Sequence, residues 1–468
     1  AALLRDDVLA EVLELAYDEE HSISQLDMYR LVDSFTSDRD DQAIEILIEK
    51  LYDMSRVQPK PYEWLNNLVK SYELADDMTV DDLHFIDDVK KAIVLELESA
   101  MSYLEEMREL TLLPDGPANY GATLVQDFEL MRTLLAVAKS GTWQSLHDAV
   151  TNVKWTRLAS IKKDEAGDPD LQERAKAKRD KAKKVVTTLA STYFMRQPVT
   201  LVNEVRRMAP IIATLVQLTK DYSERYKEVK RKRALVDFSD LEHYALQILT
   251  QPDSLEPSVV ALDLQQKFKE VLVDEYQDVN LLQETILQLV KSGGASDGNM
   301  FMVGDLKQSI YRFRLAEPRL FLGKYEDYKQ GDSGLKIDLN ANFRSRKEVL
   351  HGTNNLFEQL MTSAVGELNY DDDASLKYSG GYDDVPQPQP IEFAIVTQLE
   401  DEQDGDEDDL TQAQFEARYI IREIQRMMEA GVTVKGKDGK QRKLEYRDIV
   451  ILMRSMTWSS EFARSEEH

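Results

Sequence analysis

The first half of the chain places apolar residues at helical spacing. Segment 37–54 opens with Ser37 and Asp40, a pair typical of the capping box that begins a helix. The residues that follow put four apolar side chains on one helical face: Ile44, Leu47, Ile48 and Leu51. Because strand-like alternation is scarce throughout this half, the pattern predicts that residues 1–233 are helical.

Breaks rich in proline and glycine divide this half at residues 112–121 and 164–170. After the second break, residues 171–184 hold seven Lys and Arg residues against two acidic ones. A solvated helix face explains such a run, and contact with the phosphates of a nucleic-acid backbone is the alternative.

Near residue 234 the pattern changes to short apolar runs that alternate with helical segments. Residues 271–273, 300–303 and 335–345 are typical of strands, the first two of buried ones, and helical spacing lies between and after them. The helical faces comprise Leu241, Tyr244, Ala245, Ile248 and Leu249, then Leu282, Ile286, Leu289 and Val290, then Val349, Leu356, Phe357 and Leu360. Alternating strands and helices predict an α/β fold with a parallel sheet.

The third strand is followed by less regular sequence. Residues 366–390 and the acidic run 401–409 are typical of linkers. Residues 415–431 then show helical spacing, and residues 446–455 are typical of another buried strand.

Composition excludes several classes of protein. The 468 residues carry a net charge of −28, so a basic signature over the whole chain is absent, although a local groove can still be basic. There is no cysteine, and the six histidines are scattered, which excludes thiolate and histidine-cluster metal sites. No apolar run of about 18 residues occurs, so we expect no membrane span and a cytoplasmic protein.

The stretch VLVDEYQDVN, residues 271–280, runs from a strand directly into carboxylates. A carboxylate at the carboxyl end of a parallel strand, such as Asp274, can hold Mg²⁺, usually through water. A second one, such as Glu275, can orient or deprotonate an attacking water, which suits phosphate hydrolysis. Taken alone, the pattern also fits an ordinary strand end.

Three motifs occur in order along the chain. VLVDEYQDVN is followed by MFMVGDLKQSIYRFRLAEP at residues 300–318 and by LNANFRSRKEVL at residues 339–350. Together they resemble the UvrD-type branch of superfamily 1 DNA helicases, and within it the AddA-type helicase/nuclease subunits. The resemblance is strong over residues 234–360 and weaker elsewhere.

The resemblance implies ATP and Mg²⁺ as cofactors and assigns roles to residues of the first two motifs. Asp274 would carry Mg²⁺, Glu275 would activate water, and Gln308 would sense the γ-phosphate. Tyr311 and Phe313 would stack on single-stranded bases, and Arg314 would link the DNA face to the nucleotide face.

In the third motif, Phe343 would lie near the adenine and Arg344 would reach the γ-phosphate as an arginine finger. Each residue has a structural alternative. The aromatic residues could belong to a core, the arginines could form surface ion pairs, and Gln308 could cap a turn.

The resemblance also implies an incomplete RecA-like parallel sheet with a large helical insertion. Residues 1–233 would form the insertion, residues 234–330 the second half of the first motor domain, and residues 331–468 the start of the second. The activity would be 3′–5′ DNA helicase action with an associated exonuclease in double-strand break repair. Expected partners are single- or double-stranded DNA and a second subunit of the AddB type.

The chain departs from this family because several expected motifs are missing. A phosphate-binding loop, G-x-x-x-x-G-K-[ST], should precede Asp274, and nothing there matches it. The near match GVTVKGKD, residues 431–438, ends on Asp438 and is typical of a turn between strands. Late motor motifs and a nuclease cluster are also missing.

We therefore expect an internal piece of a longer protein that does not hydrolyse ATP by itself. Two alternatives stay open. One is a non-hydrolysing module that binds single-stranded DNA or a partner, and the other is an unrelated α/β protein with a structural metal.

Overall fold

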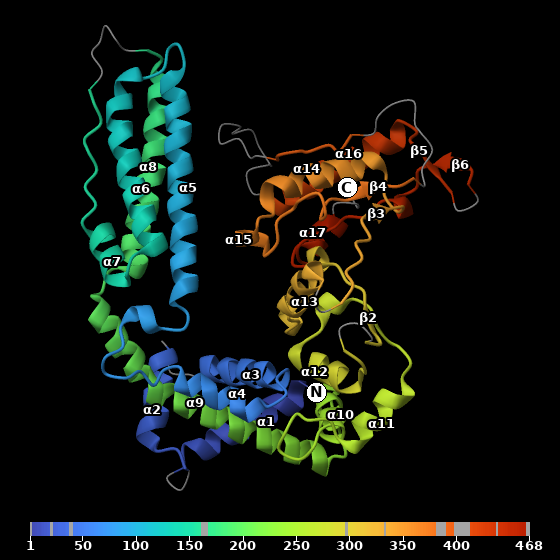
Figure 1. Cartoon of the computed structure of the whole chain (residues 1–468). Coiled ribbons are helices and arrows are strands. Elements are labelled where there is room, and N and C mark those ends of the chain that lie inside the picture. The colour runs from blue at the N-terminus through green and yellow to red at the C-terminus, as the bar shows by residue number, and fades with distance from the viewer. Residues whose placement is uncertain are drawn as a thin grey trace. The chain divides into compact units, whose positions relative to one another are not determined.

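The computed structural model describes residues 2–18, 22–36, 41–160, 167–294, 298–331, 334–380, 390–396, 412–436 and 439–464. The chain divides into two units, Ala1–Lys336 and Ile337–His468. Their relative placement is not determined (Figure 1), so each unit is described by itself. The expected capping pair Ser37 and Asp40 and the acidic run 401–409 lie outside the described residues.

The described part of residues 1–233 is helical, as predicted. The α-helices are α1 Ala2–Ala16, α2 Gln25–Phe35, α3 Gln42–Arg56, α4 Pro61–Lys70, α5 Ile86–Leu112, α6 Gly121–Ser140, α7 Trp143–Thr151, α8 Pro169–Tyr193 and α9 Pro198–Lys232. The first predicted break separates α5 from α6. The second ends where Pro169 occupies the first turn of α8, a position that needs no amide hydrogen.

These helices form two large cores, and a smaller cluster of Leu65, Ile212 and Val216 lies where α4 packs on α9. Helices α5 to α8 share one, which includes Leu97, Leu104 and Met107, and Figure 1 shows α5, α6 and α8 running side by side. Helix α9 packs with α1, α2 and α3 around the other, where Ile44 and Ile48 are fully buried and Leu47 and Leu51 partly so. The predicted face of α3 is therefore confirmed. Each large apolar side chain buried in this way stabilises the fold by about 1.5–3 kcal/mol.

The strand–helix–strand pattern predicted after residue 234 is also confirmed. Helices α10 Phe238–Leu249 and α11 Val259–Lys267 precede β1 Val271–Val273, and α12 Leu281–Val290 connects β1 to β2 Met300–Met302. The two strands are parallel, with Leu272 opposite Phe301. Short 3₁₀ turns η3 Tyr276–Asp278, η4 Leu306–Gln308 and η5 Arg312–Arg314 follow the strands, and α13 Pro318–Gln330 comes next.

Burial of these elements differs from the prediction at two places. Strands β1 and β2 are not fully buried, because Leu272 is 68% and Phe301 54% exposed. They lie on a sheet face that no element described in this unit covers. On α10, the predicted apolar face is largely wrong: of its members Leu249 is buried and Ala245 half-buried, whereas Leu241, Tyr244 and Ile248 are exposed. Leu246, which was not predicted, is buried with Leu249 in the core shared with α12. On α12 the predicted face is confirmed, with Leu282 fully buried.

The second unit contains less strand than predicted. Its elements are β3 Ala341–Asn342, α14 Lys347–Leu360, α15 Ser363–Gly366, β4 Lys377–Tyr378, α16 Gln412–Glu429, β5 Thr433–Lys435, β6 Gln441–Lys443, η6 Tyr446–Asp448 and α17 Ser459–Arg464. Only two residues of the strand predicted at 335–345 form one, and their parallel partner β4 lies in the segment 366–390 predicted as a linker. Segment 446–455 forms a 3₁₀ turn and no strand.

Two further features of this unit were predicted from the sequence: the turn near residue 438 and the apolar face of α14. Strands β5 and β6 form an antiparallel hairpin, so the described part of the near match, residues 431–436, runs through β5 and not into a helix. Residues 437–438 lie outside the described residues. On α14 the predicted face is largely wrong: Phe357 is half-buried, but Val349, Leu356 and Leu360 are exposed, and the buried residue is Leu350. Among the described residues of either unit, no helix is both long and apolar enough to cross a membrane.

Candidate functional site

The carboxyl ends of β1 and β2 bring two of the predicted motifs together. The ladder continues past the strands, since Val303 N–H donates to Val273 O at 2.8 Å and Tyr276 N–H donates to Val303 O at 2.9 Å. Asp274 and Glu275 thus lie beside Gly304 and Asp305. This is the edge of a parallel sheet at which ligands usually bind.

Glu275 adopts a left-handed backbone conformation, with φ 49° and ψ 43°. This region is unfavourable for a residue with a side chain, by about 1–2 kcal/mol. The Asp274 carboxylate helps to hold it by accepting the Glu275 N–H at 2.9 Å. The chain therefore turns sharply after β1 and leaves both carboxylates exposed at the sheet edge.

Gln277 lies beneath this turn and is only 1% exposed. Its Nε2 donates to Glu275 Oε2 at 2.6 Å, and its Oε1 accepts the Asp305 N–H at 2.9 Å. Gly304 makes room for it, because a Cβ at Gly304 would lie 2.6 Å from Gln277 Oε1. One buried amide thus joins the segment after β1 to the segment after β2.

Asp305 extends this connection to Gln308. Gln308 Nε2 donates to Asp305 Oδ2 at 2.8 Å, and Lys307 Nζ lies 2.9 Å from Asp305 Oδ1. Burial alone would raise the pKa of Asp305, but the bonds from Gln308 and Lys307 outweigh it, so the pKa lies below its ordinary value. Asp305 is therefore an ionised acceptor that holds the predicted sensor residue Gln308.

Asp278 has a different environment from the other carboxylates. Burial and the nearby charge of Glu275 raise its pKa, and the bond from Gln277 opposes this only partly. Its Oδ1 is buried without a hydrogen-bond partner in the described part of the chain. Such an orphaned oxygen is uncommon in folded proteins.

Tyr276 anchors the turn from below. Its ring is fully buried, and its hydroxyl donates to the buried carboxylate of Glu284 on α12. Lys324 on α13 pairs with the same carboxylate at 2.9 Å. Glu284 and Lys324 were not predicted from the sequence, because each occupies a helical position that gives no sign of burial.

Asp274 suits a magnesium ion that arrives with a nucleotide. It is exposed, at the end of a strand, and no ion pair is found for it within the described ranges. No group of three or more His, Cys, Asp or Glu residues able to hold a metal occurs among the described residues. Mg²⁺ commonly takes one or two carboxylates and keeps waters and phosphate oxygens for its other ligands, so a single Asp fits this use.

Tyr311, Phe313 and Arg314 form an aromatic and cationic cluster just after η4. The two ring centroids are 6.0 Å apart, and the Arg314 guanidinium lies 5.0 Å from the Tyr311 ring and 5.5 Å from the Phe313 ring. Phe313 is 75% exposed, so these rings are not core residues. The cluster offers exposed π-faces on which a flat base could stack.

Phe343 and Arg344 belong to the second unit and follow β3. Asn342 Oδ1 accepts the Arg344 N–H at 3.0 Å and the Ser345 N–H at 2.9 Å, which fixes a tight turn. Both predicted side chains are exposed beyond this turn. The structure thus presents them at the surface of their own unit, apart from any core.

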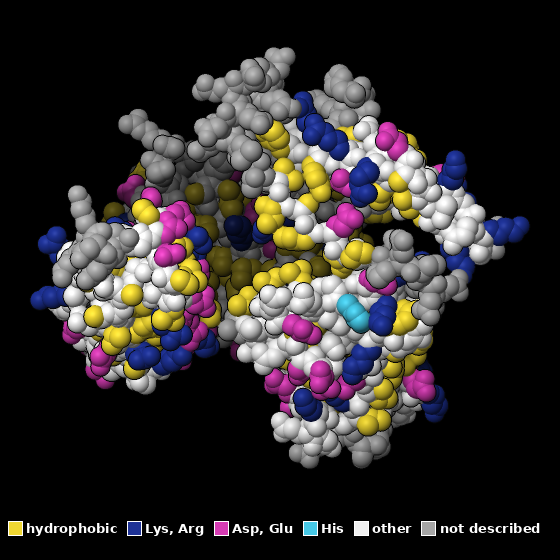
Figure 2. All heavy atoms as spheres, turned by 90° about the horizontal axis from the view of Figure 1, so that it is seen from above, with side chains coloured by type: hydrophobic (Ala, Val, Ile, Leu, Met, Phe, Trp, Pro, Cys, Tyr) yellow, Lys and Arg dark blue, Asp and Glu magenta, His cyan; other side chains and the backbone are white. Residues whose placement is uncertain are grey.

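The basic segment 171–184 lies on α8, and most of its cations have local partners. Arg179 is buried and binds both carboxylate oxygens of Asp127 on α6, at 2.6 and 2.9 Å. Three others form ion pairs and one lies over an aromatic ring: Arg174, Lys178, Lys183 and Lys181. Figure 2 shows basic and acidic side chains interspersed on this bundle. Contacts within the bundle thus explain most of the basic side chains in this segment.

Comparison with known proteins gives matches over nearly the whole chain. Residues 122–329 match a family model described as the UvrD/REP helicase N-terminal domain. A protein of Lysinibacillus sphaericus (strain C3-41), named as a subunit of an ATP-dependent helicase/nuclease, is 54% identical over 98% of this chain and 38% of its own length. A protein of Bacillus mycoides (strain KBAB4) with the same name is 43% identical over 98% of this chain and 37% of its own length. The chain thus spans well under half the length of these curated relatives.

Proposed function

Because the chain belongs to the UvrD/REP helicase family, we propose that it is part of an ATP-dependent DNA helicase/nuclease subunit with a RecA-like motor. The subunit moves 3′ to 5′ on single-stranded DNA in the cytoplasm and serves double-strand break repair. The observation that carries the proposal is the line of hydrogen bonds from Glu275 through Gln277 and Asp305 to Gln308. It supports a site in which a water-activating carboxylate and a phosphate sensor act together.

The residues after β1 and β2 divide the work of hydrolysis. Bound ATP would supply the γ-phosphoryl group and release ADP, and Mg²⁺ would neutralise the phosphate charge. Asp274 would hold the ion, while Glu275 orients the attacking water and accepts its proton. Gln308 contacts the γ-phosphate, for which it leaves its present bond to Asp305.

The remaining predicted residues contact DNA or belong to the second motor domain. Tyr311 and Phe313 stack on bases, and Arg314, which lies over both rings, connects them to the nucleotide side. In the second unit, Phe343 contacts the adenine and Arg344 stabilises the charge of the transition state. Their exposure beyond the Asn342 turn supports these roles.

The whole protein carries an exonuclease as well and works with a second helicase/nuclease subunit of the AddB type. Support for this comes from the name of the relatives, which describes one subunit of a helicase/nuclease. The 468 residues by themselves contain no match to the phosphate-binding loop, so the isolated chain hydrolyses ATP negligibly. That absence favours one second candidate: a non-hydrolysing module that binds single-stranded DNA or a partner.

The test compares unaltered protein with Glu275→Gln, each purified as its source cells make it. A motor shows DNA-stimulated ATP hydrolysis that Glu275→Gln abolishes while DNA binding persists. Absence of hydrolysis in the unaltered protein, with DNA binding intact, would favour the binding module. Hydrolysis by the isolated 468-residue chain would contradict the expectation of a deficient fragment.

A further inference from the structure

The hairpin of β5 and β6 carries a concentration of positive charge to which the proposed function gives no task. Residues 433–443 hold five Lys and Arg residues against one acidic residue, Asp438. The whole chain has the opposite balance, with 58 Lys and Arg residues against 86 Asp and Glu residues. A basic segment in an acidic protein creates a local field that attracts anions.

Strand pairing places two of these lysines on one face of the hairpin. In its antiparallel register, Thr433 lies opposite Lys443. Lys435 lies opposite Gln441, and because side chains alternate along a strand, all four share a face. All four are exposed. The two lysines are diagonal neighbours, about 7–8 Å apart in such a pair, so both can reach the same extended ligand.

The opposite face holds the hairpin to its own unit. Val434 and Arg442 lie on that face and are half-buried. Arg442 binds both carboxylate oxygens of Asp448, at 2.6 and 2.5 Å, and this contact is the main reason why the pKa of Asp448 is lowered to about 2. At the base of the hairpin, Leu444 N–H donates to Val432 O at 2.9 Å. The lysine face is therefore carried on a fixed support, and the charge of Arg442 is used within the unit.

The far end of the hairpin adds a third exposed lysine, Lys440. Gly436 N–H donates to Lys440 O at 2.8 Å, and Gly439 adopts φ 78°, which allows the chain to return tightly. Figure 1 shows the hairpin at the outer edge of its unit. A two-stranded ribbon of this width fits the major groove of a duplex and can also lie along a single strand.

The side chains of the exposed face suit phosphate oxygens. Lysine ammonium groups, a threonine hydroxyl and a glutamine amide all donate hydrogen bonds, and these residue types commonly contact nucleic-acid backbones. Residues 433–443 contain no aromatic side chain on which a base could stack. The face therefore recognises charge and not base identity.

We propose that the exposed face of β5 and β6 binds the phosphate backbone of DNA through Lys435 and Lys443, in addition to the base contacts of Tyr311 and Phe313. The inference rests on the proposed function, which identifies the polyanion as DNA. The two surfaces differ in a measurable way, because only the lysines displace counterions from phosphates. Their contribution to affinity therefore depends on salt, whereas stacking on the rings does not.

The test combines Lys435→Gln with Lys443→Gln in the protein as its cells make it. Fluorescence anisotropy measures binding of a labelled oligothymidine and of a labelled duplex between about 50 and 200 mM salt. We expect the slope of log affinity against log salt to become shallower by about 0.7 for each lysine on the single strand, or about 0.9 on the duplex.

Three further variants serve as controls. Combining Lys435→Arg with Lys443→Arg keeps both charges and should keep the slope. Lys377→Gln removes an exposed lysine from β4 of the same unit and should change neither slope nor affinity. Tyr311→Ala with Phe313→Ala should lower affinity without changing the slope.

Each outcome decides the proposal. A shallower slope on either probe supports it and shows which backbone the hairpin contacts. Unchanged slopes on both probes would overturn it and leave the lysines to protect the two open strand edges or to face an acidic protein. An equal change in Lys377→Gln would overturn it as well, by showing an effect of overall charge. If the unaltered protein binds DNA and hydrolyses ATP, such results overturn this inference alone, whereas absence of both activities overturns the proposed function too.

Discussion

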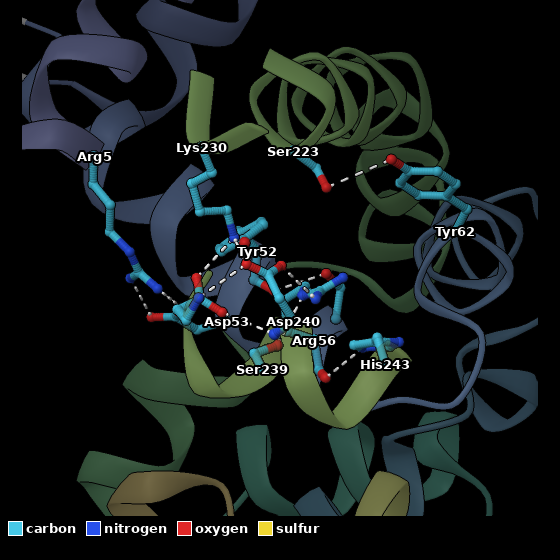
Figure 3. Close-up of polar contacts among 12 residues, drawn as sticks. Arg5, Tyr52, Asp53, Arg56, Tyr62, Ser223, Lys230, Ser239, Asp240 and His243 are labelled. Carbon is cyan, nitrogen blue, oxygen red and sulfur yellow. Dashed lines mark hydrogen bonds and ion pairs between the residues drawn. The ribbon is translucent and has the colours of Figure 1, made fainter. Parts of the chain in front are cut away.

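Lys230 near the end of α9 donates to Asp240 on α10, with Nζ 2.5 Å from Oδ2, although the lysine is only 4% exposed. Asp237, which precedes α10, accepts from the same ammonium at 2.8 Å, and the Tyr226 ring lies 4.4 Å from it. Arg56 of α3 reaches Asp240 from a third helix, at 3.3 Å (Figure 3). The helical region and the segment that leads to β1 are thus joined by a buried cluster of charges.

Lys230→Met tests how much this junction contributes. Removing the ammonium leaves two carboxylates close together with one fewer cation, so we expect the free energy of unfolding to fall by about 3–5 kcal/mol. Urea titration of the 468-residue chain measures the loss. The matched control is Lys232→Met, which removes an exposed pair with Glu228 on the same helix and costs about 1 kcal/mol or less. Equal losses in both variants would show that the buried ion pairs of Lys230 contribute no more to stability than the exposed pair of Lys232.

His243 makes the same junction sensitive to acid. Burial, together with the charge of Arg56, lowers its pKa to about 4, and its ring nitrogen Nε2 bonds to Arg56 O at 2.9 Å. An unfolded chain binds a proton at the ordinary histidine pKa of about 6.5, so between those values the unfolded state holds more protons. The free energy of unfolding should therefore fall as the pH is lowered from about 6.5 to about 4.

His243→Gln separates this contribution from that of the carboxylates. The glutamine amide can donate to Arg56 O and does not titrate. We expect the variant to lose less stability than the unaltered chain between pH 7 and pH 4.5, as measured by urea unfolding at each pH. Parallel pH dependences would show that His243 is not the group responsible.

Periodicity was informative where helices pack on one another and less so near the candidate site. The buried face of α3 was predictable because the four apolar residues of that face, Ile44, Leu47, Ile48 and Leu51, all enter one core. On α10 the spacing favoured Leu241, Ile248 and Leu249, but of these only Leu249 is buried. The helix packs on α11 and α12 through Leu249 and Leu246. A sequence pattern gives a helix an apolar stripe but does not say which part of it will be covered.

At the candidate site, too, some features could be predicted from the sequence and others could not. The position of Asp274 and Asp305 at neighbouring strand ends followed from the order of strand and helix. The burial of Gln277 did not, because a glutamine in a turn is ordinarily solvated, and the sequence does not reveal the close approach of Gly304. Lys230 was likewise unpredictable, since it lies in a basic run and its buried ion pairs are with Asp237 and Asp240, which belong to the start of α10.

Tyr311→Ala combined with Phe313→Ala tests the proposed stacking surface. Loss of both rings should weaken binding of a single-stranded oligonucleotide by about 1–3 kcal/mol for each stacked base. Fluorescence anisotropy with a labelled oligothymidine measures this on the isolated chain. Phe238→Ala is the control, because Phe238 is similarly exposed on the same unit but lies outside the cluster. Unchanged affinity in the double variant would contradict the stacking role of the two rings.

Gly304→Ala tests the close approach on which the Gln277 contacts depend. The added methyl group would lie 2.6 Å from Gln277 Oε1 and 3.3 Å from its backbone nitrogen, so the amide must move away from Asp305. We expect DNA-stimulated kcat to fall by about 10²-fold, as for other misplacements near 1 Å, in the protein as its cells make it. Gly323→Ala on α13 is the matched control, because nothing lies within 4 Å of its added methyl group. That change should leave kcat unaltered and raise helix stability by roughly 0.5–1 kcal/mol. A normal kcat in Gly304→Ala would mean that the site tolerates displacement of Gln277, whereas a loss confined to this variant would locate the constraint at the amide.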